Sequence, residues 1–119
     1  MILVDTSVWI DHLRRGVSEL ERLLDENTVL VHPFIIGELA CGNLRDRAEV
    51  LGHLQNLPRS VVASDEEVLH FIESHQLMGQ GVGFLDVHLL ASAQLSENAS
   101  IWTRDRKLAA AAARLSISH

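Results

Sequence analysis

The chain has a single cysteine, few aromatic residues and no long apolar run. Its 119 residues include one cysteine, no tyrosine, two tryptophans and three phenylalanines. A single cysteine cannot form an intrachain disulfide, which fits a reducing compartment, and we expect a cytoplasmic protein. No apolar run approaches the roughly 20 residues that a membrane-spanning helix needs. These absences argue against a disulfide scaffold and against a membrane protein.

Basic residues are also scarce, because ten Lys and Arg stand against 16 Asp and Glu, for a net charge of −6. That balance argues against a protein that binds nucleic acid through a broad basic face. It remains compatible with an enzyme whose acids are neutralised by metal ions. The seven histidines show no HxxxH or HExxH spacing, so the sequence does not indicate a zinc site.

Strand-like and helix-like segments alternate along the chain. This alternation predicts one α/β domain over residues 1–119, with a mainly parallel central sheet flanked by helices. The predicted strands span residues 2–4, 28–32, 60–63, 100–103 and 115–118. The predicted helices begin near residues 6, 18, 33, 45, 64, 85 and 105. Gly16 is expected to end the first helix, and Ser64 with Glu67 forms a capping box. We expect Cys41 to be a small core residue and Arg45 to pair with Glu49.

Two aspartates follow predicted strands. Asp5 ends the apolar run 2–4, and Asp105 comes after the short strand at 101–103. In open α/β sheets, ligands usually bind at the carboxyl ends of the strands. Either aspartate could instead be the N-cap of the helix that follows it. Near Asp5, however, Thr6 and Ser7 already offer that cap.

Two further acids lie among apolar residues in predicted helices. Glu38 has Phe34, Ile35 and Cys41 at helical spacing, and a carboxylate on such a stripe is costly to bury unless it is paired or bound to metal. The alternative is a solvent gap in the helix. Asp86 opens a run of leucines and alanines, although the helix dipole by itself favours an acid in a first turn.

If these four carboxylates converge, they form an oxygen-ligand cage for a hard divalent cation such as Mg²⁺. Arg104, Arg106 and Lys107 crowd the start of the last helix, where cations are mildly disfavoured. They indicate an anionic partner such as a phosphate backbone, or alternatively a solvated charged corner. The glycines at 79, 81 and 83 form a loop without the features of a phosphate-binding loop.

Four short motifs resemble those of a known family. Residues 4–10 (VDTSVWI) are similar to the first motif of PIN-domain ribonucleases, and residues 38–42 (ELACG) to their Glu-Leu-x-x-Gly helix. Asp86 with residues 89–91 is similar to the third acidic motif, and residues 103–105 to the final Thr-x-Asp. The motifs occur in the family's order over essentially the full length. The chain thus resembles the VapC-type toxins of bacterial toxin–antitoxin pairs. One departure is the run 107–109, where many relatives carry an aromatic residue.

The resemblance implies an endoribonuclease that uses one or two Mg²⁺ or Mn²⁺ ions. Its catalytic and metal-binding residues would be Asp5, Glu38, Asp86 and Asp105. Hydrogen-bonding support would come from Thr6, Ser7 and Thr103, and RNA contacts from Arg104, Arg106 and Lys107. The implied partners are RNA, a VapB-like antitoxin in the active-site groove and a second copy of the chain, with no membrane involved.

The same residues allow other interpretations. A PIN scaffold that binds a partner without cleaving RNA is the main alternative. A signalling receiver domain needs an acid pair after the first strand, and a haloacid-dehalogenase-like phosphatase needs Asp-x-Asp there. Neither requirement is met, because Asp5 is followed by Thr6 and Ser7.

Overall fold

The structure, a computed structural model, describes residues 1–119 and contains a three-stranded parallel sheet in the order β2-β1-β3. The elements in chain order are β1 Ile2–Val4, α1 Thr6–Arg15, α2 Ser18–Asp25, β2 Val29–Leu30, α3 Pro33–Ala40, α4 Arg47–Gln55, α5 Asp65–His75, α6 Phe84–Leu95, β3 Ser100–Trp102 and α7 Arg106–Arg114. None of the helices has the length and apolar character to cross a membrane. The predicted α/β architecture with a parallel sheet is confirmed.

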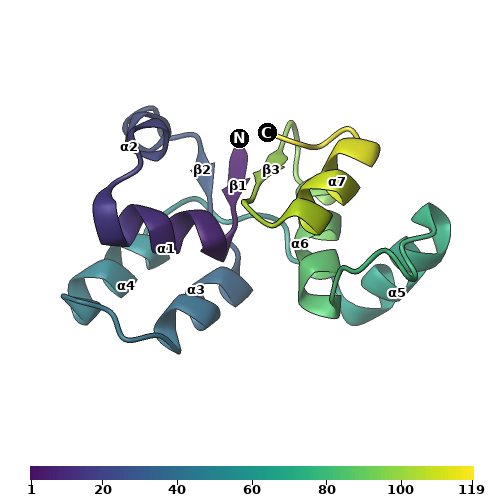
Figure 1. Cartoon of the computed structure of the whole chain (residues 1–119), viewed down its shortest axis with the longest axis horizontal. Helices are drawn as coiled ribbons and strands as arrows, with labels where there is room; N and C mark the ends of the chain where they lie inside the picture. Colours follow the sequence, from purple (N-terminus) through teal and green to yellow (C-terminus); the bar gives the residue numbers. More distant parts are fainter.

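The helices cover the sheet from two sides (Figure 1). On one side, α3 packs against both α1 and α4; on the other, α6 and α7 pack against β3, and α5 packs on α6. The central strand β1 is entirely apolar, and its Leu3 and Val4 are completely buried. Such continuous apolar runs are typical of parallel strands with both faces covered.

The carboxyl ends of β1 and β3 lie side by side. The register pairs Val4 with Trp102, and the Asp5 backbone N–H donates to the Trp102 carbonyl oxygen at 2.9 Å. The residues that directly follow each strand therefore meet at one edge of the sheet. This is the position at which the sequence predicts a ligand site.

Two predicted helix boundaries are confirmed. Gly16 has a φ of 75° and ends α1, a left-handed backbone conformation that glycine adopts at no steric cost. Before α5, the Ser64 hydroxyl accepts from the Glu67 N–H, and the Glu67 carboxylate accepts from the Ser64 N–H. This reciprocal pair is the predicted capping box.

The predicted strand at 60–63 is wrong. The segment joins the sheet through a single bridge between Val31 and Arg59. Beyond it, the backbone N–H of Ala63 donates to the hydroxyl of Ser92 on α6, and that of Val61 donates to the hydroxyl of Ser96, which caps the end of α6. Because side chains of a helix take these donors, the ladder cannot continue.

The predicted edge strand at 115–118 is reduced to one bridge. Ile101 and Ser118 form a parallel bridge, in which Ile101 donates to Ile117 and accepts from His119. Ser116, with a φ of 61°, has a left-handed backbone just before this contact. Only the last residues therefore run alongside β3.

Two side-chain predictions are also wrong. Cys41 is exposed, because α3 ends at Ala40 and the cysteine lies just beyond the packed turns. Glu49 lies 3.7 Å from His53, four residues further along α4, whereas Arg45 lies before the helix begins. Both errors arise because each predicted helix extends one or two residues beyond the observed one.

Candidate active site

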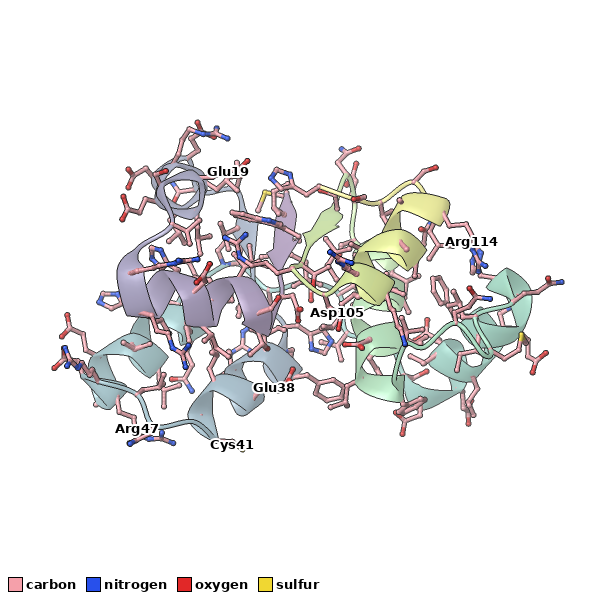
Figure 2. The ribbon with its side chains drawn as sticks, viewed as in Figure 1. Glu19, Glu38, Cys41, Arg47, Asp105 and Arg114 are labelled. Atoms are coloured by element: carbon pink, nitrogen blue, oxygen red, sulfur yellow. The ribbon has the colours of Figure 1, made fainter.

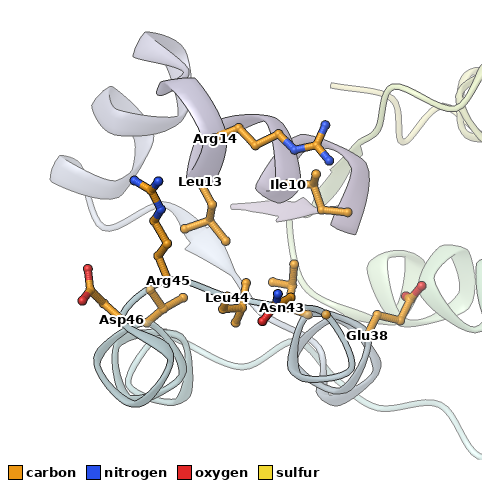
Figure 3. A pocket seen from close by; sticks show the side chains of 11 residues that line it. Ile10, Leu13, Arg14, Glu38, Asn43, Leu44, Arg45 and Asp46 are labelled. Atoms are coloured by element: carbon orange, nitrogen blue, oxygen red, sulfur yellow. The ribbon is translucent and has the colours of Figure 1, made fainter.

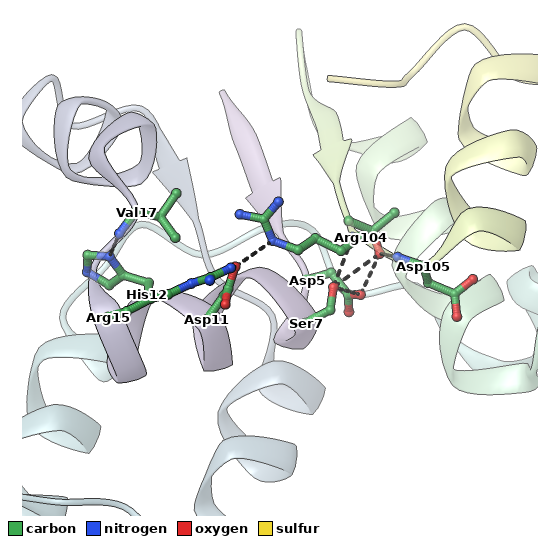
Figure 4. Close-up of polar contacts among 9 residues, drawn as sticks. Asp5, Ser7, Asp11, His12, Arg15, Val17, Arg104 and Asp105 are labelled. Atoms are coloured by element: carbon green, nitrogen blue, oxygen red, sulfur yellow. Dashed lines mark hydrogen bonds and ion pairs between the residues drawn. The ribbon is translucent and has the colours of Figure 1, made fainter.

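Asp5 is the buried acid of the site, with 7% of its surface exposed. It occupies the N-cap position of α1, but its side chain makes no capping hydrogen bond. Its Oδ2 instead accepts from the Thr103 hydroxyl at 2.7 Å and from the Ser7 hydroxyl at 3.0 Å (Figure 4). The carboxylate is therefore fixed by the segment after β3 as well as by its own helix.

The same two hydroxyls connect Asp5 to the start of α7. Thr103 Oγ1 accepts from the Asp105 N–H, and Ser7 Oγ accepts from the Arg104 N–H, each at 3.0 Å. Asp105 is exposed, and its Oδ1 accepts from the N–H groups of Lys107 and Leu108. Asp105 is thus an N-cap, as the sequence allowed, and it also lies next to the Asp5 network.

Glu38 enters the site from α3. The Thr6 hydroxyl donates to its Oε1 at 3.1 Å. The prediction of a carboxylate buried in an apolar stripe is wrong, because the Glu38 side chain is exposed. Partial desolvation still raises its pKa, opposed by the Thr6 hydrogen bond and reinforced by the negative charges of Asp5 and Asp86.

Asp86 enters from the first turn of α6 and is partly buried. Its Oδ2 accepts from the Gly83 N–H at 3.4 Å, so it caps the helix only weakly. Desolvation raises its pKa, the Gly83 hydrogen bond opposes that shift, and the charges of Asp5 and Asp105 add to it.

The four acids therefore share one electrostatic environment. Figure 2 shows Glu38 and Asp105 in the middle of the molecule, between the two groups of helices. No three Asp, Glu, His or Cys side chains of the chain lie close enough to form a metal-binding group. The arrangement is more open than a closed ligand cage. Mutual repulsion of carboxylates favours such separation when no cation joins them.

Each of the four carboxylates has one oxygen in a protein hydrogen bond and one without a protein partner. The hydrogen-bonded atoms are Asp5 Oδ2, Glu38 Oε1, Asp86 Oδ2 and Asp105 Oδ1. Carboxylate oxygens are the ligands that Mg²⁺ and Mn²⁺ prefer. By the chemistry of its donors, this set of residues fits a hard divalent cation.

The predicted RNA-binding residues have different surroundings. The Arg104 Nε lies 3.1 Å from Asp11 Oδ2, and its guanidinium carbon lies 6.0 Å from the centre of the Trp102 ring. The Lys107 side chain passes over Gly81, where an added Cβ would lie 2.5 Å from Lys107 Cδ. Arg106 is exposed and makes no ion pair.

The partner of Arg104 was not predicted from the sequence. Asp11 also pairs with Arg15 at 2.9 Å, one helical turn further along α1. The spacing of four residues between these two indicates the second pair, but nothing in the sequence connects Asp11 to Arg104. That contact depends on how α1 and the segment after β3 pack.

A groove of about 680 Å³ begins next to Glu38 and runs between α1 and the segment joining α3 to α4 (Figure 3). Apolar side chains form part of its lining, with Arg14 and Arg45 among the polar ones. The full lining is Ile10, Leu13, Arg14, Glu38, Leu39, Gly42, Asn43, Leu44, Arg45, Asp46 and Val50.

The family model described as the PIN domain matches residues 2–114. The chain belongs to the PIN-domain family. Over 118 residues it is 43% identical to the protein named Ribonuclease VapC32 of Mycobacterium tuberculosis, in strains CDC 1551 / Oshkosh and ATCC 25618 / H37Rv. This match covers 99% of the chain and 95% of that protein, so the resemblance to VapC-type PIN domains is confirmed.

A solved structure supports the fold. The crystal structure of PAE2754 from Pyrobaculum aerophilum aligns with a TM-score of 0.58 and 20% identity, covering 92% of this chain and 78% of that one. At that identity the likeness concerns the fold of this PIN domain alone.

Proposed function

We propose that this PIN domain is a metal-dependent endoribonuclease that acts in the cytoplasm as the toxin of a type II toxin–antitoxin pair. The observation that carries the proposal is the set of four carboxylates, each with one oxygen held by the protein and one without a protein partner. The 43% identity to a protein named as a ribonuclease supports the choice of RNA as substrate. Catalytic roles are proposed for Asp5, Glu38, Asp86 and Asp105.

The proposed mechanism is hydrolysis of an RNA phosphodiester by a water molecule. Asp5, Glu38 and Asp86 would bind one or two Mg²⁺ or Mn²⁺ ions, and Asp105 would help to bind the metal or orient the water. When bound, the ions supply charge neutralisation, activation of water and stabilisation of the leaving oxygen.

The chain's other residues fix the geometry of these acids. Ser7 and Thr103 orient Asp5 through Oδ2, and Thr6 orients Glu38 through Oε1. Arrangements of this kind, in which neighbouring groups hold a ligand's second oxygen, set the orientation and affinity of metal ligands. Arg104, Arg106 and Lys107 would contact the RNA.

The proposed protein partner is a VapB-like antitoxin that occupies the groove beside Glu38. The groove combines apolar side chains with Arg14, Arg45 and the Glu38 carboxylate, which suits a partly apolar peptide with a basic residue near the acids. A homodimer is also proposed. Exposed apolar side chains at Phe84 and Leu85 support it, because such groups favour burial in an interface.

The direct experiment incubates the purified protein with total RNA and Mg²⁺, with and without EDTA, and maps the new 5′ ends. The proposal expects discrete ends that disappear with EDTA and with Asp5→Asn. The alternative, a scaffold that binds without cleaving, expects no new ends in any sample. Equal cleavage with and without EDTA would contradict metal dependence.

A further inference from the structure

Asp11, on α1, lies among three guanidinium groups, those of Arg14 and Arg15 on the same helix and that of Arg104 after β3. Asp11 pairs with Arg15 at 2.9 Å and with Arg104 at 3.1 Å. The Arg15 hydrogen bond and the positive charges of Arg15, Arg104 and Arg14 lower the pKa of Asp11. A local excess of positive charge thus lies next to the acid site of a chain whose net charge is −6.

Arg104 is held at several points (Figure 4). Its Nε lies 3.1 Å from Asp11 Oδ2, and its backbone N–H donates to Ser7 Oγ. Its guanidinium carbon lies 6.0 Å from the Trp102 ring centre. Its two terminal nitrogens, Nη1 and Nη2, donate no hydrogen bond to the protein, and 46% of the side chain is exposed. An arginine fixed through Nε presents a planar pair of donors that matches two oxygens of a phosphate.

The position of this donor pair is tied to the reactive centre. Ser7 Oγ, which accepts from the Arg104 N–H, donates to Asp5 Oδ2. Two hydrogen bonds therefore connect the Arg104 backbone to the most buried acid of the site. An ordinary surface ion pair contributes little to the stability of a protein and needs no such connection.

We propose that Arg104, oriented by Asp11, binds a backbone phosphate of the RNA strand next to the bond that is cut. Asp11 is a positioning residue in this scheme, and Arg14 and Arg15 add positive charge along the path of the strand. The inference rests on the proposed ribonuclease function and adds a defined phosphate subsite to it. The RNA phosphate is recognised through its charge and its two unesterified oxygens.

The sharpest test is Asp11→Asn, because two explanations predict opposite changes in the affinity for RNA. Removal of a negative charge from a surface that only attracts RNA by its overall field would tighten binding. Loss of the anchor for Arg104 weakens it instead. The probe is a fluorescein-labelled single-stranded RNA, and its affinity is measured by fluorescence anisotropy in EDTA, where metal-dependent cleavage is blocked. We expect affinity to fall several-fold, and unchanged or tighter binding would overturn the proposal.

The matched control for that variant is Asp25→Asn, which removes the same charge from the exposed end of α2. It should bind RNA as the wild type does, or slightly more tightly. An equal weakening in Asp25→Asn and Asp11→Asn would show a general effect of the substitution and contradict the subsite.

A second test removes the guanidinium. Arg104→Ala should weaken RNA binding about tenfold, which is the usual loss for one charged hydrogen-bonding group. The slope of log affinity against log salt should also fall by about 0.7, the value for one phosphate contact on a single strand. Arg104→Lys keeps the charge but not the paired donors, and should recover only part of the affinity. Arg22→Ala, at an arginine that pairs with Glu19 and Glu26 on α2, should change neither quantity.

A neutral probe separates phosphate binding from other causes. A peptide nucleic acid of the same sequence has no phosphates, so Arg104→Ala should not change its affinity. An equal loss for both probes would overturn the proposal. Circular dichroism and thermal melting of each variant would show whether it is folded before its affinity is interpreted.

Failure of this inference is distinguishable from failure of the proposed function. If the wild type cleaves RNA with Mg²⁺ but Arg104→Ala keeps full affinity, full salt slope and unchanged KM, only the subsite is wrong. If the subsite is right, KM rises in Arg104→Ala and in Asp11→Asn with a smaller change in kcat. If the wild type does not cleave RNA at all, the proposed function itself fails.

Discussion

The four acids divide into two pairs that the protein holds in different ways. Asp5 and Asp105 follow adjacent parallel strands, and each accepts two hydrogen bonds through one oxygen. Glu38 and Asp86 lie on helices, each accepts one longer hydrogen bond, and the pKa of each is raised. Each carboxylate of the strand-end pair is thus fixed by two hydrogen bonds, whereas each carboxylate of the helix pair accepts one and is repelled by its acidic neighbours.

The difference suggests how such a site is assembled. A parallel sheet brings its strand ends together whatever is bound there, so the first pair is placed by the fold. The helix pair is pushed apart by like charge and would be drawn in when a cation binds. The absence of a close three-residue group is consistent with a site whose fixed half lies on the strands.

The largest effect is expected for Asp5→Asn, which removes the most buried charge of the fixed pair. We expect a folded protein whose Mg²⁺-dependent RNA cleavage is lower by at least about 100-fold, on the scale of removing one charge-stabilising group from an active site. The measurement is kcat/KM on RNA, with circular dichroism as the control for folding. Full activity in a folded variant would contradict the role of Asp5.

Thr103→Val tests the connection between the fixed acids without changing any charge. Thr103 Oγ1 donates to Asp5 and accepts from the Asp105 N–H, and valine can do neither. Loss of a group that orients a metal ligand typically costs about 10- to 100-fold in activity or metal affinity. We expect a loss in that range, measured as kcat/KM and as the Mg²⁺ dissociation constant. Thr103→Ser, which keeps the hydroxyl, is the matched control and should retain most of the activity.

A buried histidine, His32, caps the start of α3, the helix that carries Glu38. The side chain of His32, which is fully buried, accepts from the Phe34 N–H through Nδ1, and desolvation together with the charge of His88 lowers its pKa from 6.5 to about 4. Between those values the unfolded state binds more protons, so stability falls as pH drops from 6.5 towards 4. Urea unfolding across this range should show a loss of roughly 1–3 kcal/mol.

The control for that prediction is His32→Asn, which keeps an N-cap acceptor but cannot titrate in this range. It should be less stable than the wild type at neutral pH, because a large buried ring is lost. Its stability should also change less with pH. An identical pH dependence in both proteins would show that His32 does not cause the loss of stability at low pH.

The smallest effect concerns the stability of the helix pair without metal. The ordinary pKa values are 4.5 for Glu38 and 3.8 for Asp86, and both are raised. From those values up to the raised ones, the folded state binds more protons, so stability falls as pH rises through that window. Glu38→Gln and Asp86→Asn should therefore stabilise the metal-free protein at neutral pH by less than about 1 kcal/mol, since solvent screens partly exposed groups.

Thermal melting in EDTA measures the stabilisation by these two substitutions, and melting with Mg²⁺ provides the comparison. The wild type should melt at a higher temperature with Mg²⁺, because a ligand that binds only the folded state stabilises it. The two neutral variants should gain less from the ion. Destabilisation of both variants in EDTA would show that the helix pair is not under electrostatic strain.

Much of this division could be predicted from the sequence. The apolar run before Asp5 and the short strand at 101–103 before Asp105 predicted two acids after parallel strands, and Thr103 connects those two residues in the structure. The hydroxyls of Thr6 and Ser7 were also proposed as support, and each donates to an acid. These predictions rest on local signals, because a strand and the residue after it are adjacent in the chain.

The errors occur where a prediction depended on packing between distant segments. Glu38 was predicted to be buried in an apolar stripe, but it is exposed, although Ile35 one turn earlier is fully buried. The N–H groups of Val61 and Ala63 donate to serines about 30 residues away, on α6 and at its end, which prevents the predicted strand. Asp11 and Arg104 are 93 positions apart, and no periodic pattern connects them.

The most direct measurement is isothermal titration of Mg²⁺ into the wild type and into Glu38→Ala, Asp5→Asn, Asp86→Asn and Asp105→Asn. A single centre built from the four carboxylates predicts measurable binding to the wild type and weaker binding to every variant. The fixed acid Asp5 should show a larger loss than Glu38. No detectable binding of Mg²⁺ or Mn²⁺ to a folded wild type would contradict the metal centre, and so would variants that all bind as the wild type does.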